Sequence, residues 1–266
     1  MKSDISTLVP FYNNGRTIRQ AVMSVIEQDS FSGEIIIYDD GTKDEESLDE
    51  LSKLENEFDI LSVITGKQNC GAGIARGRLI EAAKHPLAAF LDADDVWAKT
   101  KIEKQLSVLE DPSVGVCYSS YYICTENLLP VSQKAAPPEV TYRSMLCENC
   151  IPTSTSIFRT EAARAFPFPA LRQRQDYAFW LLFLKSHPQL RAVGLGEPLA
   201  YYRKSSGSLS SSRLRNIAYN YKVFRDCVGY GRVASAALTA RNGYYRYFRS
   251  RIEPIVTSDA KSSGVM

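Results

Sequence analysis

Short apolar runs alternate with helical patterns along the N-terminal third of the chain, and this alternation limits the possible folds more than any other feature. The runs cover Ile5–Val9, Ile35–Tyr38, Leu61–Ile64 and Leu87–Leu91. After the first run, apolar residues recur at helical spacing in Ile18, Val22, Val25 and Ile26. Parallel strands that helices cover on both faces are nearly continuous apolar stretches. The pattern therefore predicts an α/β fold with a doubly wound, mostly parallel sheet.

The middle of the chain continues this pattern less regularly. We expect strands at Val114–Tyr118 and Thr155–Phe158, and a helix over Tyr177–Leu184 with Asp176 in its first turn. Residues 125–140 contain Asn127 and three prolines, and are predicted to form a loop.

Length and composition exclude several classes of protein. The 266 residues suffice for one large domain or for a domain with an appendage. The formal net charge of +2 excludes a global basic field, so no nucleic-acid partner is expected. We expect neither a secretory signal nor a spanning helix, because no apolar run approaches the ~18–20 residues that a span needs. The six scattered cysteines do not suggest a disulfide framework, and the lone C-x-x-C at Cys147–Cys150 is interpreted as structural. A cytoplasmic protein is predicted.

The fourth apolar run ends in three carboxylates, Asp92, Asp94 and Asp95. Side chains alternate along an extended chain, so Asp92 and Asp94 point to the same side. Such a pair can hold Mg²⁺ or Mn²⁺, which binds one or two carboxylates and completes its shell with substrate phosphates. The plainer interpretation is an acidic turn that precedes the next helix and faces water.

Other polar residues follow the ends of neighbouring runs. Asp39 and Asp40 follow the second run, and Arg76 lies in the helix that follows the third. In a parallel sheet all these ends lie at one edge. Taken singly, Asp39-Asp40-Gly41 can be a simple turn and Arg76 a surface arginine. Together they supply acceptors for a base and ribose, and a guanidinium able to bind phosphate oxygens, which predicts a nucleoside diphosphate site.

Five motifs occur in order between residues 4 and 212. They are Val9–Asn13, Tyr38–Asp44, the Gly73-x-x-Arg76 helix start, Leu91–Trp97 and Gln175–Trp180. In this order and spacing the chain resembles the GT-A glycosyltransferases of family 2. The resemblance implies a GT-A fold and an inverting, metal-dependent transfer of a hexose from a nucleotide-diphosphate donor, commonly a UDP-sugar. It also implies a glycan or undecaprenyl-diphosphate-linked acceptor in the synthesis of surface polysaccharide such as O-antigen, capsule or lipopolysaccharide.

The resemblance assigns roles by match of motif. Asp40 would bond the edge of the base, Asp39 or Asp92 would reach the ribose or the donor sugar, and Arg76 the phosphates. Asp94 would coordinate the metal, Mn²⁺ or Mg²⁺. The complete donor-binding set that is implied comprises Pro10, Phe11, Tyr12, Asp39, Asp40, Arg76, Asp92, Ala93 and Lys204.

Asp176 falls where the family places its general base. Displacement at an anomeric carbon needs a carboxylate to take the proton of the acceptor hydroxyl. It also needs the metal and Arg76 to neutralise the negative charge of the departing diphosphate. The plainer interpretation is an acid in a first helical turn, which favours the helix dipole. The chain departs from the family at Lys99–Thr100, where Pro-Asp is common, and at Ser205, where relatives often carry histidine. Lys204 beside Ser205 could instead offer charge to the diphosphate.

The C-terminal part differs in character from the rest. We expect a catalytic, nucleotide-sugar-binding domain over 1–212, a helical region over 213–257 and a disordered tail over 258–266. Between Arg213 and Arg251, nine basic residues accompany a single acid, Asp226, and several aromatics. A basic, aromatic amphipathic helix suits an anionic membrane surface at the inner face of the cell membrane. An ordinary pair of terminal helices with a solvated basic face explains the composition equally well.

Two other functions fit parts of the chain. Gly71–Gly77 approaches the G-x-G-x-x-G fingerprint of an NAD(P)-dependent oxidoreductase, and Asp92 lies about the expected ~20 residues beyond it. That fingerprint belongs after the first strand, however, whereas Gly71 follows the third predicted strand. The second alternative is a non-catalytic member of the family that binds nucleotide sugar without turnover; the presence of Asp176 argues against it.

Overall fold

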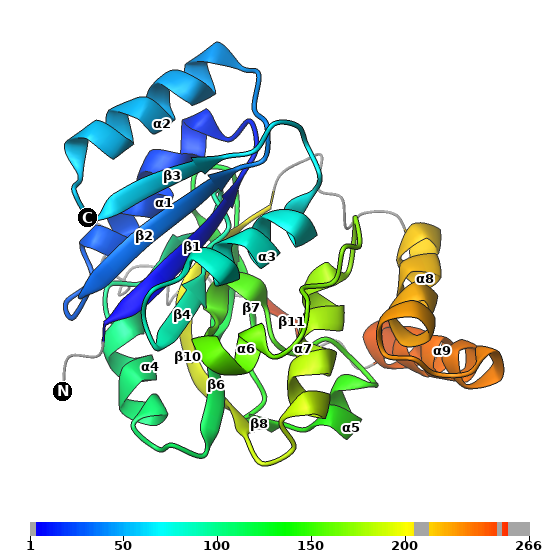
Figure 1. Cartoon of the computed structure of the whole chain (residues 1–266). Helices are drawn as coiled ribbons and strands as arrows, with labels where there is room; N and C mark the ends of the chain where they lie inside the picture. The colour runs from blue at the N-terminus through cyan, green and yellow to red at the C-terminus, as the bar shows by residue number, and fades with distance from the viewer. Residues whose placement is uncertain (1–3, 205–212, 249–251, 255–266) are drawn as a thin grey trace.

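The computed structural model describes residues 4–204, 213–248 and 252–254, and one mixed sheet runs through it (Figure 1). Along its main path the strands are β11 (Ile252–Pro254), β7 (Pro130–Lys134), β6 (Val114–Cys124), β9 (Ile157–Arg159), β4 (Leu87–Phe90), β1 (Ile5–Phe11), β2 (Gly33–Asp39) and β3 (Leu61–Thr65). Off this path, β10 (Arg191–Arg203) pairs with β5 (Val96–Trp97), with β6 and with β8 (Glu139–Val140).

The sheet is parallel where the sequence alternates and mixed elsewhere. Strands β4, β1, β2 and β3 are all parallel, as the four apolar runs predict. Strand β9 enters antiparallel between β4 and β6, while β10 runs parallel to β6. The predicted loop over 125–140 is wrong in part, because β7 and β8 lie inside it. Their pairing with β6 and β10 overrides the weak local preference of these residues for a strand.

Helices cover both faces of the sheet, and strand alternation divides the core between them. Helices α1 (Gly15–Ile26), α2 (Glu45–Glu57) and α4 (Lys101–Leu109) pack with one set of strand side chains, for example Val9 and Ile37. Helices α3 (Ala72–Ala82), α6 (Thr160–Arg164) and α7 (Gln175–Ser186) pack with the other set, for example Leu8 and Ile36. The doubly wound arrangement predicted from periodicity is confirmed.

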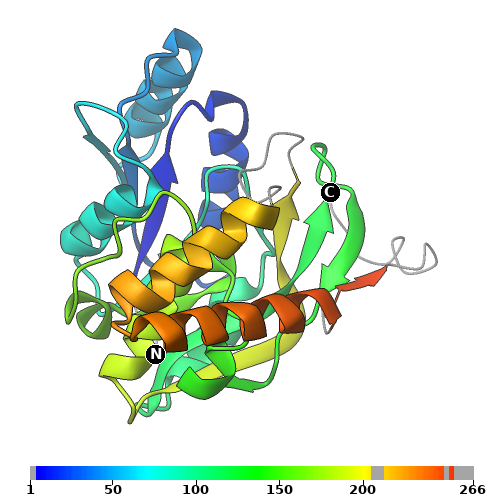
Figure 2. The same ribbon diagram turned by 90° about the vertical axis from the view of Figure 1, so that its right-hand side faces the viewer.

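The C-terminal helices lie on the face of the sheet that α3, α6 and α7 cover, beyond α7 and α5 (Tyr142–Met145), as Figures 1 and 2 show. They are α8 (Arg213–Lys222), the π-helical turn η3 (Val223–Cys227) and α9 (Arg232–Phe248). Val223, Phe224 and Val228 belong to the core on that face, and β11 then pairs with β7. The region is thus packed into the molecule as well as helical. Ser205 and the predicted tail over 258–266 lie outside the described residues.

In the described part of the chain, no helix combines the length and the apolar character needed to cross a bilayer. All six cysteines are free thiols, in agreement with the absence of a predicted disulfide framework.

Candidate active site

The carboxyl ends of β1, β2 and β4 meet at one edge of the sheet. Phe11 lies opposite Asp39 in the parallel pairing of β1 with β2, and Leu8 lies opposite Phe90 in the pairing with β4. The acids that follow β2 and β4 therefore flank the end of β1, as the rule for open parallel sheets predicts.

Asp39 and Asp40 form a rigid turn at this edge. The Oδ1 of the buried Asp39 accepts a hydrogen bond from the Thr42 amide at 2.9 Å, across Gly41, whose φ is +76°. The carboxylate of Asp40 accepts from the amide of Cys70 at 2.9 Å and from that of Gly71 at 2.7 Å. Asp40 thus holds the loop that begins α3, and it keeps lone pairs for a further donor.

The remaining predicted donor residues beside β1 and β4 differ in exposure. Tyr12 is exposed and Pro10 half-buried, so both are accessible at the edge. Phe11 and Ala93 point into the core with α1 and α4. Contacts from these two residues to a nucleotide would therefore come from their backbone, and the Phe11 carbonyl already accepts from the Asp40 amide at 2.9 Å.

Arg76 and Asp92 form an ion pair at the centre of this edge. Arg76 comes from the second turn of α3 and is 5% exposed, while Asp92 follows β4 and keeps more contact with solvent. The guanidinium carbon lies 5.8 Å from the ring centre of Phe90, and the buried Nε atom has no hydrogen-bond partner among the described residues. The sequence predicted that these two residues lie at the same edge of the sheet, and in the structure they are in direct contact.

Three carboxyls lie close together after β4. Burial and, secondarily, the charge of Asp92 raise the pKa of Asp94 to about 6. Burial raises the pKa of Asp95 well above its ordinary value, and the charges of Asp94 and Asp92 add to the effect. The Nε of Arg203, at the end of β10, donates to the Asp94 carbonyl at 2.8 Å. A cation bound beside these carboxyls would offset the repulsion between their charges and favour their ionised forms.

The donor set fits a hard divalent ion. Asp94 offers carboxylate oxygens, and Asp92 lies on the same turn. Among the described residues, no group of three acidic, histidine or cysteine side chains is arranged to form a metal site by itself. Mg²⁺ and Mn²⁺ do not need one, because they are commonly bound through one or two carboxylates together with substrate phosphates.

The sequence interpretation missed Ser154, which forms hydrogen bonds with two residues of the acidic turn, Asp92 and Asp95. It lies in the 3₁₀ turn η1 (Thr153–Thr155). Its hydroxyl donates to Oδ2 of Asp95 at 2.5 Å and accepts from the Asp92 amide at 3.1 Å. Its carbonyl accepts from Nε1 of Trp97 at 2.7 Å. The run of four hydroxyl residues from Thr153 to Ser156 was the available signal, because buried hydroxyl groups need hydrogen-bond partners.

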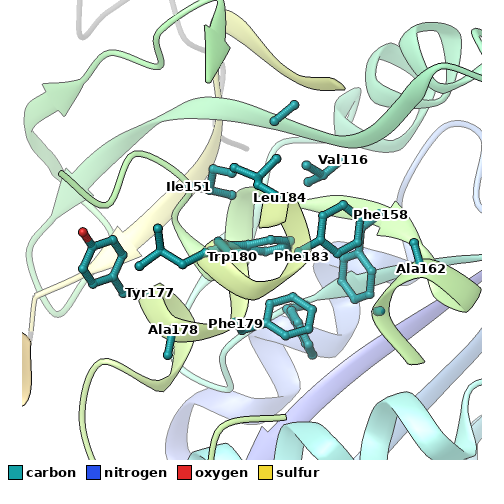
Figure 3. Packing of buried hydrophobic residues seen from close by; sticks show 14 of the residues in the cluster. Val116, Ile151, Phe158, Ala162, Tyr177, Ala178, Phe179, Trp180, Phe183 and Leu184 are labelled. Atoms are coloured by element: carbon teal, nitrogen blue, oxygen red, sulfur yellow. The ribbon is translucent and has the colours of Figure 1, made fainter. Parts of the chain in front are cut away.

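Asp176 lies in the first turn of α7, as the sequence predicted. The chain enters this helix through Arg174, which adopts the left-handed conformation with φ +62°. The side-chain amide of Asn149 donates to Oδ2 of Asp176 at 2.9 Å. Asn149 belongs to the Cys147–Cys150 segment and had no assigned role. Figure 3 shows how Phe179, Trp180 and other apolar side chains anchor this helix in the core.

Gly73 allows α3 to approach the segment that leads into α7. A Cβ atom at Gly73 would lie 2.6 Å from the Pro169 carbonyl oxygen and 3.3 Å from Cβ of Gln175. The helix that carries Arg76 and the helix that begins beside Asp176 are therefore neighbours. Gly71 caps α3 after the third strand, so this glycine-rich segment does not occupy the position of a dinucleotide fingerprint.

Lys204 follows β10 directly after Arg203. It is exposed, and its amide donates to the Cys124 carbonyl at 3.0 Å. The predicted role of its side chain at the diphosphate stays a prediction.

Comparisons with solved structures identify the fold. S. aureus TarS 1-349, crystallised with UDP-GlcNAc, superposes with a TM-score of 0.68 at 22% identity, covering 93% of this chain and 74% of that one. The mannosyltransferase PcManGT from Pyrobaculum calidifontis, in complex with GDP-Man and Mn²⁺, gives a TM-score of 0.66 at 14% identity and covers 100% of this chain and 77% of that one. The expected GT-A fold is confirmed.

Sequence comparisons agree with this result. The model of the family "Glycosyl transferase family 2" matches residues 6–173. The UDP-Glc:alpha-D-GlcNAc-diphosphoundecaprenol beta-1,3-glucosyltransferase WfaP from Escherichia coli is 31% identical over 227 residues, which are 83% of this chain and 85% of WfaP. The chain belongs to glycosyl transferase family 2 and is a glycosyltransferase.

Proposed function

We propose that this chain is a metal-dependent, inverting glycosyltransferase that moves a hexose from a UDP-sugar to a glycan or an undecaprenyl-diphosphate-linked acceptor in surface-polysaccharide synthesis. The pairing of Arg76 with Asp92 beside Asp94 is the observation that carries the proposal. WfaP is named for UDP-glucose and a diphosphoundecaprenol-linked acceptor, and TarS was crystallised with UDP-GlcNAc; both support this choice of substrates.

The donor is proposed to bind across the ends of β1, β2 and β4. Asp40 bonds the base edge between Pro10 and Tyr12, and Asp39 or Asp92 bonds the ribose or the donor sugar. The guanidinium of Arg76, which is paired with Asp92 at this edge, binds diphosphate oxygens. Lys204 adds positive charge from the end of β10.

Asp176 is proposed to be the general base. Its carboxylate takes the proton of the acceptor hydroxyl as that oxygen bonds to the anomeric carbon. The bond from this carbon to the diphosphate oxygen breaks on the opposite side, so configuration is inverted and UDP leaves as the anion. Asn149 donates to Oδ2, which leaves Oδ1 for the acceptor. Mn²⁺ or Mg²⁺ held at Asp94, with Asp92 adjacent, would supply charge neutralisation to the leaving diphosphate.

The outward side of the C-terminal helices supports a membrane contact. Residues on the inner side of α9 are polar and buried, namely Ser235, Thr239 and Asn242. Its outer side carries Val233, which is 85% exposed, and Tyr244, which is 55% exposed. Exposed basic residues on the same helical segments include Arg215, Lys222, Arg225, Arg232 and Arg241. Exposed apolar groups among cations suit the surface of an anionic bilayer, so we place the protein at the inner face of the cell membrane.

A donor panel tests the reaction. UDP-glucose, UDP-GlcNAc and GDP-mannose are each incubated with the protein and Mn²⁺, with and without a GlcNAc-diphospholipid acceptor, and released nucleoside diphosphate is measured. We expect release that depends on metal and acceptor with a UDP-sugar. Asp176→Asn should remove turnover and leave UDP binding unchanged, whereas the exposed Asp59→Asn should change neither.

Three outcomes would contradict parts of this proposal. Turnover that survives in Asp176→Asn would show that another group is the base. Metal-dependent UDP binding with no turnover from any donor would favour the non-catalytic alternative. Failure of the protein to float with phosphatidylglycerol vesicles at low salt would contradict the proposed membrane contact but not the proposed transfer reaction.

A further inference from the structure

Four helices are joined by one directed chain of buried hydrogen bonds. Nδ2 of Asn220 on α8 donates to Oδ1 of Asn242 on α9 at 2.8 Å. Nδ2 of Asn242 donates to the hydroxyl of Tyr177 on α7 at 3.0 Å. That hydroxyl donates to the carbonyl of Met145 at the end of α5, at 2.6 Å. All four residues are buried, so each of these bonds is made away from water.

This series of hydrogen bonds ends next to the candidate base, Asp176. Tyr177 follows Asp176 directly, and Asn149, which donates to Asp176, lies shortly after Met145 in the sequence. The start of α7 and the segment after α5 are therefore joined at two adjacent points, Tyr177 with Met145 and Asp176 with Asn149. Figure 3 shows the Tyr177 ring at the margin of the aromatic cluster, with its hydroxyl directed away from Trp180.

The C-terminal helical region contacts Tyr177 at two points, its hydroxyl and its ring. Asn242 reaches its hydroxyl, and the ring of Phe224 meets its ring edge-on, with centroids 5.9 Å apart and planes at 83°. An asparagine in the interior is costly unless its polar groups are paired, and Asn242 is paired through both Oδ1 and Nδ2. Oδ1 of Asn220 has no hydrogen-bond partner among the described residues. Networks of paired buried groups restrict geometry more than apolar contacts do.

We propose that Asn242 is a positioning residue for Asp176. Through Tyr177, the C-terminal helices fix the angle at which α7 begins and so the direction of the carboxylate that takes the acceptor proton. This inference rests on the proposed role of Asp176 as base. It makes α8 and α9 part of the catalytic unit, in addition to any surface they present to a membrane.

The test compares two substitutions on the inner side of α9. Asn242→Ala removes the bond to Tyr177. Thr239→Ala is the matched control, because Thr239 is also buried on α9 but its hydroxyl donates only to Ser235 of the same helix, at 2.7 Å. Both variants are assayed well below their unfolding midpoints, with the UDP-sugar that the wild type turns over. Hydrogen exchange is followed in residues 145–150 and 175–178.

We expect Asn242→Ala to lower kcat by about tenfold, within the ~10²-fold that a misplaced catalytic group can cost. KM for the donor and affinity for UDP should stay unchanged, and exchange should increase in both segments. Thr239→Ala should leave kcat within about twofold of the wild type, since no bond to α7 is lost. Tyr177→Phe should also lower kcat, and the double variant Tyr177→Phe/Asn242→Ala should be no slower than the slower single variant, because both act through one hydroxyl.

Failure of this inference differs from failure of the proposed function. Equal kcat in Asn242→Ala and Thr239→Ala, together with inactivity of Asp176→Asn, would overturn the inference and leave the base assigned. Additive losses in the double variant would also overturn it, because the two groups would then act independently. Full turnover by Asp176→Asn would refute the base itself and the inference with it.

Discussion

The side-chain nitrogen of Lys101 lies 4.0 Å from the ring centre of Trp97, in the core between α4 and the acidic turn. Lys101 is completely buried, and its Nζ atom has no hydrogen-bond partner among the described residues. Burial lowers the pKa of this amine to about 7. The Trp97 indole also donates to the carbonyl of Ser154. The Lys101 amine, which has no polar partner among the described residues, therefore packs on Trp97, and Trp97 follows Asp95 by two residues.

Replacement of this amine should change how stability depends on pH. The folded chain holds Lys101 neutral above about pH 7, whereas the unfolded chain keeps the amine protonated up to its ordinary pKa of 10.5. Unfolding therefore takes up a proton between these values, and stability rises with pH across this window. Lys101→Met should remove this slope and raise the free energy of unfolding at pH 6.5 by on the order of 1–3 kcal/mol.

Urea denaturation at pH 6.5 and 9.5 measures this effect. Lys99→Met, at an exposed lysine two positions earlier, is the control and should preserve the wild-type slope. A Lys101→Met variant that keeps the wild-type pH slope, or that is less stable than the wild type at pH 6.5, would contradict this prediction.

Ser154→Ala should affect both folding and donor binding. The substitution leaves the buried Asp95 carboxyl without its hydroxyl donor and the Asp92 amide without its acceptor. Loss of partners for buried groups costs about 1–3 kcal/mol each. Because the same bonds shape the turn that carries Asp94, Mn²⁺-dependent UDP binding should also weaken, as calorimetry can measure. Ser156→Ala is the control, since Ser156 is also buried but its hydroxyl donates to the Thr153 carbonyl.

Local sequence patterns were sufficient to predict the parallel strands and the residues at their carboxyl ends. The strands β1 to β4 are short apolar runs between helices, and the rule for parallel sheets then places Asp39, Asp92 and Arg76 at one edge without any knowledge of contacts. The position of Asp176 followed likewise from the strongly apolar helix behind it.

The features that were missed depend on contacts between distant segments. Ser154 lies 62 residues from the Asp92 amide that it binds, and Asn242 lies 65 residues from Tyr177. No periodicity marks such a partner. The short strand β7 was missed for the same reason, because pairing with β6 and β11 makes it a strand although its own residues favour a loop.

Asp94→Asn should separate metal-dependent from metal-independent donor binding. The amide keeps the size of the side chain but removes the charge that a hard divalent cation requires. We expect UDP affinity in the presence of Mn²⁺ to fall by about tenfold or more, to the level that the wild type shows in EDTA. Asp226→Asn, at an exposed acid on the C-terminal helices, should leave the metal dependence unchanged. A metal effect that persists in Asp94→Asn would assign the ion to other ligands.

Two glycines in helices should respond to alanine in opposite directions. Gly243 lies within α9 and a Cβ atom there would meet nothing within 4 Å, so Gly243→Ala should gain the ~0.5–1 kcal/mol that alanine contributes over glycine in a helix. At Gly73, by contrast, a Cβ atom would come within 2.6 Å of the Pro169 carbonyl oxygen, and backbone must shift to admit it. Gly73→Ala should therefore lower the unfolding midpoint and, by moving α3 away from the segment before Asp176, lower kcat as well. Thermal unfolding and donor turnover of the two variants test the argument: a Gly73→Ala protein as stable and as active as Gly243→Ala would show that α3 and α7 do not need this close approach.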